Sequence, residues 1–244
     1  AIAIVISHLG MTIYLLYYLF FVQNIILIKF RKLSINIFND IMKVGGLGLL
    51  NSLTIAFTVA VVTGYVGNYG IKALAGYGLG ARLELMLTPI IFGLGAALTA
   101  SVSINIGSKQ FDRARKIAWT GGFISFVVIG FIGLLVSIFP ILWLSNFTSD
   151  PDALFFSEKY LNIVGPFYCL FGLGQALYFA SQGTGKMIRP ILVGLCRFSS
   201  VIAIGYLALF YGMSINVIFI AVSIGLIITG IGMSFCLTGP EWRK

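Results

Sequence analysis

Glu84 is the residue whose chemistry stands out most in this sequence, because it opens a long apolar stretch. Residues 85–108 follow it without a formal charge, a run long enough for a helix to cross the ~30 Å hydrocarbon core of a bilayer. A charged side chain at the middle of such a helix costs on the order of 3 kcal/mol, so charges there usually have a function. We predict that Glu84 binds a proton or a cation in a vestibule. The alternative is a structural ion pair with Arg82 or Lys72 at the outer interface.

Uncharged polar side chains inside other apolar stretches form a second group of candidates. They can line an ion or substrate path, or they can hydrogen-bond to a neighbouring helix for about 0.6 kcal/mol each. The candidates for the path are Asn51, Thr54, Asn105, Asn162 and Gln175. Aromatic rings can also stack on a flat organic cation. The rings considered for that role are Phe92, Phe167, Tyr168, Phe171 and Tyr178.

Two prolines lie inside apolar stretches, Pro89 and Pro166. A proline removes a backbone hydrogen bond and kinks its helix. We predict that both residues act as hinges, and the alternative is static packing.

Arg197 and His8 are expected to be structural rather than functional. Arg197 lies close to the start of an apolar stretch, so we expect its aliphatic stem to snorkel and to place the guanidinium group at the cytoplasmic interface. His8 is the single histidine of the chain, and packing or an interfacial position is the simpler interpretation.

The composition places these residues in a membrane protein. The chain is 59% hydrophobic and 9% charged, with a mean hydropathy of +1.04, whereas soluble domains carry about 25% charged residues. The apolar runs are continuous, which excludes a membrane β-barrel, because barrel strands alternate apolar and polar residues. The net charge of +9 comes from basic residues in short loops between these runs, which argues against nucleic acid as a partner.

The sequence has no pattern typical of an enzyme, a metal centre or an ATP-driven pump. One histidine and few acids do not make a catalytic constellation. The phosphate-binding pattern GxxxxGK[ST] is absent. The three cysteines stand singly in apolar segments, which predicts buried thiols rather than metal ligands. We therefore expect no catalytic residue, no metal and no cofactor.

Seven apolar segments predict an all-α fold, a polytopic bundle of transmembrane helices. Between the first two segments, residues 29–43 repeat apolar positions every four residues, which predicts an amphipathic linker on the cytoplasmic surface. The glycine-rich stretch 67–80 and the acidic stretch 145–159 are interpreted as loops. The segments cover roughly residues 1–28, 44–66, 85–106, 117–144, 160–181, 190–211 and 215–237.

Lysine and arginine gather in alternate connections of this bundle: 29–43, 109–116, 186–189 and the tail 243–244. The positive-inside rule then predicts that these connections and the C-terminus are cytoplasmic, and that residue 1 lies outside. Because the chain starts at Ala1 within an apolar run, we expect it to be a piece of a longer protein of the cytoplasmic membrane.

Residues 78–116 resemble a stretch of the multidrug and toxic compound extrusion (MATE) family of secondary transporters. That family shows Arg-x-Glu, then Pro, then a Phe-Gly-x-Gly-x-Ala run, a Gly-x-Asn-x-Gly-like end and an Arg-Ala pair. Ser103 stands where the family often has glycine. The matching residues are Arg82, Glu84, Pro89, Phe92, Gly93, Gly95, Ala97, Asn105, Gly107, Arg113 and Ala114.

A second stretch, residues 179–192, is similar to the family's turn between its tenth and eleventh helices. The matching residues are Gly183, Gly185, Lys186 and Pro190. The family has twelve helices in two six-helix lobes. The resemblance therefore implies that residues 44–244 form the C-terminal lobe and that residues 1–28 are the last helix of an N-terminal lobe that is otherwise missing.

The resemblance implies an antiporter that exports drugs or organic cations across the cytoplasmic membrane, coupled to inward H⁺ or Na⁺ flux. One departure concerns the coupling ion. Some members carry a cation-binding acid on the helix that corresponds to residues 44–66, but this sequence has none there and none in 160–181. The alternatives are a flippase for a lipid-linked polysaccharide with the same two-lobe architecture, and a helical bundle that transports nothing.

Overall fold

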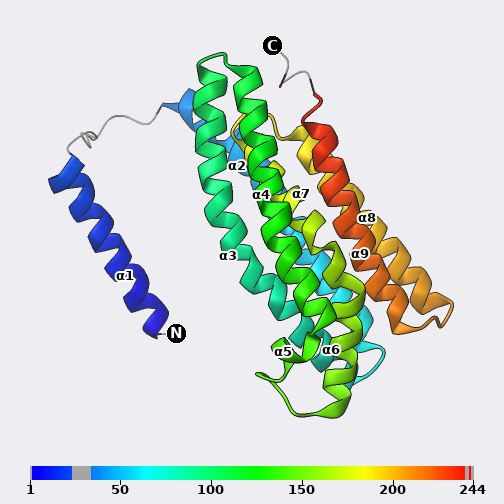
Figure 1. The fold of residues 1–244 in the computed structure, drawn as a ribbon. Helices are drawn as coiled ribbons and strands as arrows, with labels where there is room; N and C mark the ends of the chain where they lie inside the picture. Colours follow the sequence, from blue (N-terminus) through cyan, green and yellow to red (C-terminus); the bar gives the residue numbers. More distant parts are fainter. Residues whose placement is uncertain (1, 24–33, 240–241, 243–244) are drawn as a thin grey trace. The chain divides into compact units, whose positions relative to one another are not determined.

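The computed structural model of the chain describes residues 2–23, 34–239 and 242, and the regular elements in these ranges are all helical (Figure 1). The predicted all-α fold is thereby confirmed. The chain divides into two compact units, Ala1–Asp40 and Ile41–Lys244. Residues 24–33, which include the first five residues of the predicted linker and three of its four basic side chains, lie outside the described residues.

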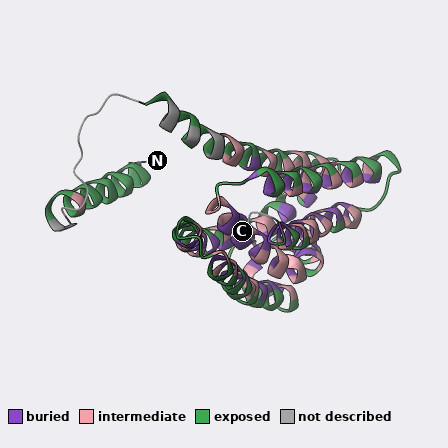
Figure 2. Ribbon diagram, turned by 90° about the horizontal axis from the view of Figure 1, so that it is seen from above, coloured by how far each residue is buried: buried purple, intermediate pink, exposed green. Residues whose placement is uncertain are grey.

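The first unit contains α1 (Ile2–Tyr17), which continues as a π-helical turn over Tyr18–Gln23. No residue of α1 is buried, as its uniform colour in Figure 2 shows. The ring of His8 hydrogen-bonds to the carbonyl oxygen of Ile4 within the helix at 2.8 Å. His8 is exposed in this unit, and a packed or interfacial position stays a prediction.

Within the described residues, seven helical spans are long and apolar enough to cross a membrane. Their number agrees with the seven apolar segments of the sequence, and this confirms the predicted polytopic helical bundle. The spans are Ile2–Phe21, Gly45–Gly67, Ile71–Gly107, Phe111–Ile138, Pro151–Gln182, Ile188–Phe210 and Ile215–Cys236.

Helices α2 (Ile35–Gly67) and α3 (Ile71–Gly107) are longer than the sequence predicts. Residues 35–43 of the predicted linker form the first turns of α2. The prediction that residues 67–80 form a loop is wrong except for the short turn before Ile71, where α3 begins. The predicted division into domains stays a prediction.

The reason for this error lies in the glycines of α3. A Cβ atom on Gly76 would lie 2.6 Å from the Cβ atom of Phe156, and one on Gly80 would lie 2.5 Å from Cδ1 of Tyr160. Both distances are far below normal contact, so only glycine lets α3 approach the next helices this closely. These glycines serve helix packing rather than a flexible loop.

The middle of the chain forms two long spans joined by a short helix. The predicted acidic loop 145–159 is wrong in its second half, because a helix begins at Pro151 and is capped by the Asp150 carboxylate, which accepts a hydrogen bond from the backbone N–H of Asp152 at 3.2 Å. The α-helix is interrupted by a 3₁₀ turn that contains Pro166. The elements are α4 (Phe111–Ile138), α5 (Pro140–Leu144), α6 (Pro151–Val164), the turn Gly165–Phe167 and α7 (Tyr168–Gln182).

Helices α8 (Ile188–Phe210) and α9 (Ile215–Cys236) complete the second unit. Its buried residues face the interior of the bundle, as the view from above in Figure 2 shows. Hydroxyl groups bridge the helices there: Thr99 Oγ1 donates to the carbonyl oxygen of Phe179 at 2.8 Å, and Ser125 Oγ to that of Gly172 at 2.8 Å. Small and hydroxyl residues thus bring α3 and α4 close to α7.

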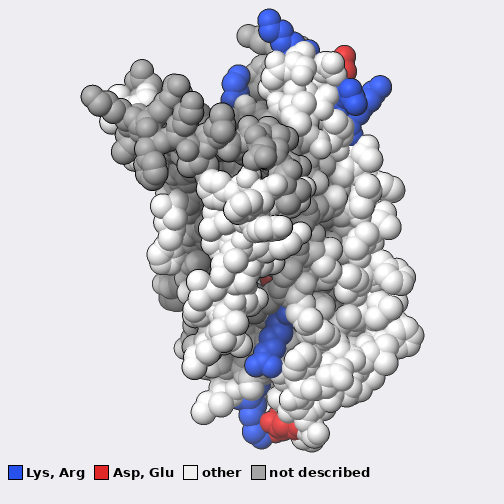
Figure 3. Space-filling model, turned by 90° about the vertical axis from the view of Figure 1, so that its left-hand side faces the viewer, with Lys and Arg blue, Asp and Glu red and all other residues white. Residues whose placement is uncertain are grey.

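Charged residues of the second unit lie mainly toward the two ends of the bundle. The turn between α3 and α4 and the turn between α7 and α8 lie at the same end in Figure 1, as the alternation of basic connections requires. On the face shown in Figure 3, most of the long surface between the ends carries no charge. This is the charge distribution expected of a bundle whose middle faces lipid.

Candidate functional site

A cavity of about 480 Å³ lies inside the second unit, between α2, α3, α6, α7, α8 and α9. Its volume falls in the range of roughly 300–1,000 Å³ that small-molecule sites occupy. The wall is mostly apolar. The polar and charged side chains on it are Asn51, Ser52, Thr58, Glu84, Thr88, Gln175, Gln182 and Arg197, together with the hydroxyls of Tyr77, Tyr160 and Tyr178.

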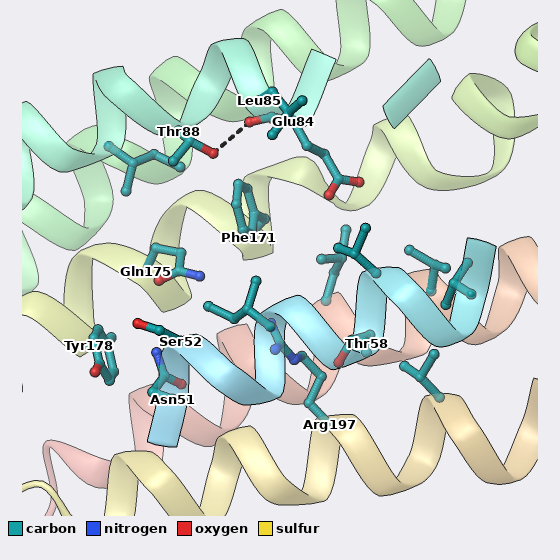
Figure 4. A pocket seen from close by; sticks show the side chains of 18 of the residues that line it. Asn51, Ser52, Thr58, Glu84, Leu85, Thr88, Phe171, Gln175, Tyr178 and Arg197 are labelled. Carbon is teal, nitrogen blue, oxygen red and sulfur yellow. Dashed lines mark hydrogen bonds between the residues drawn. The ribbon is translucent and has the colours of Figure 1, made fainter. Parts of the chain in front are cut away.

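Glu84 is held at this cavity by two tyrosines. Its Oε1 atom accepts hydrogen bonds from the hydroxyl groups of Tyr160, at 2.6 Å, and Tyr168, at 3.1 Å. Figure 4 shows the side chain extending from α3 into the space between the helices. The carboxylate is therefore fixed in position at the edge of an apolar chamber.

The structural ion pair considered for Glu84 is not formed. Lys72 instead pairs with Asp152 at the end of the bundle. The Arg82 guanidinium carbon lies 5.6 Å from the centre of the Phe147 ring. Residues two apart on a helix point to different faces, so Arg82 is exposed while Glu84 faces inward.

The structure brings together some of the predicted path residues and separates others. Asn51, which is 8% exposed, and Gln175 line the cavity with Glu84 (Figure 4). Thr54 lies beside them but donates to the carbonyl oxygen of Asn51 at 2.8 Å. Asn105 donates to the carbonyl oxygen of Ser101 within its own helix, and Asn162 is exposed. Neither of these asparagines is among the residues that line the cavity.

Arg197 contradicts the expectation from the sequence. It is 8% exposed and lines the cavity, so its guanidinium group does not snorkel to an interface. In Figure 4 the side chain extends from α8 toward the interior that Glu84 enters from α3. The physical reason is packing: α8 is rotated so that this position faces α9 and the cavity rather than the surface.

Several other cavity residues on α2 were not predicted from the sequence, although their spacing indicates them. The lining positions Asn51, Ser52, Ile55, Thr58 and Val59 recur at intervals of three and four residues, the spacing of one helical face. Hydroxyls and an amide on one face of an apolar helix indicate that this face lines a polar space.

Three of the aromatic residues considered for stacking line the cavity: Phe92, Phe171 and Tyr178. Phe92 and Phe179 are in edge-to-face contact, with their ring centres 5.1 Å apart. Tyr168 contributes through its hydrogen bond to Glu84 instead. The chamber thus combines a carboxylate with aromatic walls, which is a suitable environment for an organic cation.

Some of the motif glycines position the helices that form the site. Gly95 allows α3 to contact Phe179, because a Cβ atom there would lie 2.3 Å from Cδ2 of that ring. Gly183 packs against the carbonyl oxygen of Thr99, and Gly185 has a φ of +71° in the turn before α8. Nothing lies within 4 Å of a Cβ atom placed on Gly93 or Gly107.

Pro190 is buried in the first turn of α8, whereas Pro89 is exposed within the continuous helix α3. Pro166 lies in the 3₁₀ turn between α6 and α7. The structure thus interrupts the α-helix at Pro166 and not at Pro89. The hinge role of both residues stays a prediction.

The electrostatics of the cavity depend on two opposite charges, which attract each other without forming a direct ion pair. Between the described residues Glu84 and Arg197 there is no ion pair within 4.0 Å. Among the residues that the structure describes, no group of three or more His, Cys, Asp or Glu side chains could hold a metal. A cation that enters the cavity would therefore meet one carboxylate, at Glu84, and an anion would meet one guanidinium group, at Arg197.

Comparison with known proteins places this arrangement in a family. Residues 49–207 match the family model described as MatE. The chain is 22% identical over 167 residues to the probable multidrug resistance protein YoeA of Bacillus subtilis (strain 168), which is 68% of this chain and 36% of that protein. It is 26% identical over 173 residues to the multidrug export protein MepA of Staphylococcus aureus (strain MSSA476), which is 68% of this chain and 38% of that protein.

Solved structures show the same fold. A MATE structure in complex with MaD5 aligns with a TM-score of 0.83 at 18% identity, over 94% of this chain and 52% of that chain. The MATE transporter ClbM in complex with Rb⁺ aligns with a TM-score of 0.79 at 18% identity, over 86% of this chain and 50% of that chain. This chain thus spans about half the length of these transporters. The match to the family model covers most of the chain, and together with the shared fold it establishes that the chain belongs to the MATE family.

Proposed function

We propose that this chain is the C-terminal lobe of a secondary antiporter that exports drugs or organic cations across the cytoplasmic membrane, in exchange for inward H⁺ or Na⁺. The observation that carries the proposal is the carboxylate of Glu84, held by two tyrosine hydroxyls at the edge of an aromatic cavity. The names of the relatives YoeA and MepA support drug export rather than polymer flipping.

The chemistry of the cavity suggests how the exchange would work. A cationic substrate and the coupling ion compete for the same carboxylate, so binding of H⁺ or Na⁺ at Glu84 displaces the substrate. Phe92, Phe171 and Tyr178 would hold the flat apolar part of the substrate. Rocking of this lobe against an N-terminal lobe would open the cavity to each side in turn, as transporters built from repeated lobes do.

The orientation in the membrane belongs to the same proposal. The basic turns at one end of the bundle and the C-terminus would face the cytoplasm. Cysteine labelling from each side of the membrane tests this. Labelling of residues 145–150 from the cytoplasm alone would contradict the orientation.

Transport is tested on the full-length protein. The measurement is the movement of a fluorescent organic cation in membrane vesicles, first with an imposed proton gradient and then with a sodium gradient. We expect movement under one of the two gradients, and that gradient identifies the coupling ion. No movement under either gradient would overturn the proposal and favour a flippase, to be tested with lipid-linked sugars, or a bundle that transports nothing.

A further inference from the structure

Arg197 is a buried cation with two nitrogen atoms, Nε and Nη2, that have no hydrogen-bond partner. Its side chain is 8% exposed. Both nitrogen atoms are shielded from solvent. A buried guanidinium group with two unpaired donors is expensive in an apolar environment. A protein that retains one beside a cavity has a reason to leave these donors free.

The surrounding helices hold this side chain in place. A Cβ atom on Gly225 of α9 would lie 3.2 Å from Cγ of Arg197 and 2.8 Å from Cγ2 of Val201. The absence of a side chain at Gly225 therefore makes room for the aliphatic stem of Arg197. With the stem packed against α9, the guanidinium group is directed to the cavity that it lines (Figure 4).

The opposite charges of Glu84 and Arg197 attract each other, but the two side chains are not in direct contact. The Oε1 atom of Glu84 already accepts from Tyr160 and Tyr168, and no ion pair within 4.0 Å links Glu84 to Arg197. The other polar side chains of the described wall are hydroxyls and amides, which carry no charge. The cavity thus presents a carboxylate and a separate guanidinium group, joined by an aromatic and apolar wall.

We infer that Arg197 is an anion-binding subsite of this cavity and that it binds the carboxylate of the transported molecule. The planar guanidinium fork matches a carboxylate in a bidentate geometry, which makes this pairing both strong and specific. With the cationic part of the same molecule near Glu84, the cavity is suited to flat aromatic zwitterions. The inference rests on the proposed function and deepens it, since it adds a second recognition element to the same site.

Rhodamine B and its ethyl ester form a matched pair of probes for this subsite. They share one cationic ring system, and only the acid carries a carboxylate. Binding to the purified full-length protein is measured by fluorescence polarisation, in a buffer with gluconate as the anion. On the unmodified protein we expect the acid to bind about tenfold more tightly than the ester, the effect of one good charge-assisted contact. This arm depends on no variant.

The variant Arg197→Gln removes the charge, and Arg197→Lys keeps the charge but loses the fork. We expect Arg197→Gln to abolish the preference for the acid while the ester binds within about twofold of its affinity for the unmodified protein. Arg197→Lys should retain part of the preference, and it serves as the test if Arg197→Gln does not fold. The control is Arg82→Gln, an exposed arginine on the same bundle, which should leave both affinities unchanged.

The outcomes separate this inference from the proposed function. If both probes bind equally well to the unmodified protein, the anion subsite is wrong and the drug cavity stands. If neither probe binds, the proposed function fails and the subsite fails with it. Replacing gluconate with chloride tests whether Arg197 binds a small inorganic anion instead of a substrate carboxylate. If chloride binds at Arg197 and the acid shows no preference, the site takes a small inorganic anion, which overturns the assignment to a substrate carboxylate.

Discussion

Two acid–base combinations of the second unit differ in almost every respect. Lys72 and Asp152 form an ion pair at the end of the bundle, with side chains that are 67% and 53% exposed. Glu84 and Arg197 lie at the cavity inside the bundle and do not pair. Water screens the first pair, so it costs little and stabilises little.

The second combination is the more informative one. Charges within the membrane region are expensive, and pairing would be the simplest way to reduce their cost. Here the carboxylate binds two tyrosine hydroxyls and the guanidinium group keeps free donors. The exposed pair is a surface feature, whereas the interior charges are separated from each other, as the proposed binding of ligands requires.

The substitution Glu84→Gln should have the largest effect and tests the functional side of this contrast. Glutamine keeps the size of the side chain and can still accept from Tyr160 and Tyr168, but it cannot be charged. We expect gradient-driven efflux of an organic cation to fall about tenfold or more, with the thermal unfolding midpoint little changed. The matched control is Asp152→Asn in the exposed pair. Equal efflux in Glu84→Gln and the unmodified protein would remove the distinction between the two combinations.

The substitution Gly80→Ala tests whether close packing of α3 positions the interior acid. The new Cβ atom would lie 2.5 Å from Cδ1 of Tyr160, the ring whose hydroxyl holds Glu84. Overpacking of this kind costs roughly 1–3 kcal/mol, so we expect a clear decrease in the unfolding midpoint and weaker transport. Gly64→Ala on α2 is the control, because nothing lies within 4 Å of a Cβ atom there. A similar midpoint for both variants would contradict the packing role.

Tyr160→Phe and Tyr168→Phe separate the two hydrogen bonds to Glu84. The Tyr160 hydroxyl lies 2.6 Å from Oε1 and the Tyr168 hydroxyl 3.1 Å from it. Each change removes one donor to the carboxylate, at a cost of about 1 kcal/mol, and the shorter contact should contribute more. The measurement is the unfolding midpoint of each variant in the same detergent. A larger decrease for Tyr168→Phe would show that the two contacts are ranked incorrectly.

The smallest effect is expected for Lys72→Ala in the exposed pair. Because both partners are largely solvated, we expect the unfolding midpoint to stay within experimental error and transport to stay within about twofold. Raising the salt concentration should weaken the pair in the unmodified protein without affecting transport. A loss of transport comparable to that of Glu84→Gln would mean that the exposed pair also takes part in the mechanism.

Local features of this chain could be predicted from the sequence, whereas contacts in the interior of the bundle could not. The apolar segments were predictable, because length and hydropathy are local properties of the chain. Glu84 could be singled out for the same reason, as an acid beside a long uncharged run. The stretch 67–80 was misinterpreted as a loop, because a glycine that lets helices approach and a glycine that forms a turn look identical in the sequence.

The composition of the site could be predicted only in part. Of the predicted path residues, Asn51 and Gln175 line the cavity with Glu84, whereas Asn105 and Asn162 do not. Their role in a path stays a prediction. An amide in an apolar helix can satisfy itself on its own backbone, as Asn105 does, and the sequence does not distinguish that from a polar wall.

The sequence by itself determined that this chain is a helical membrane protein with an acid beside one long apolar helix. Only the tertiary structure decided which groups that acid meets. Tyr160 and Tyr168 lie 76 and 84 residues from Glu84 in the chain, and they reach its carboxylate because packing sets the rotation of their helices. The rotation of α8 likewise turns Arg197 inward. The rotation of a helix about its axis depends on contacts between distant segments, and no local pattern contains that information.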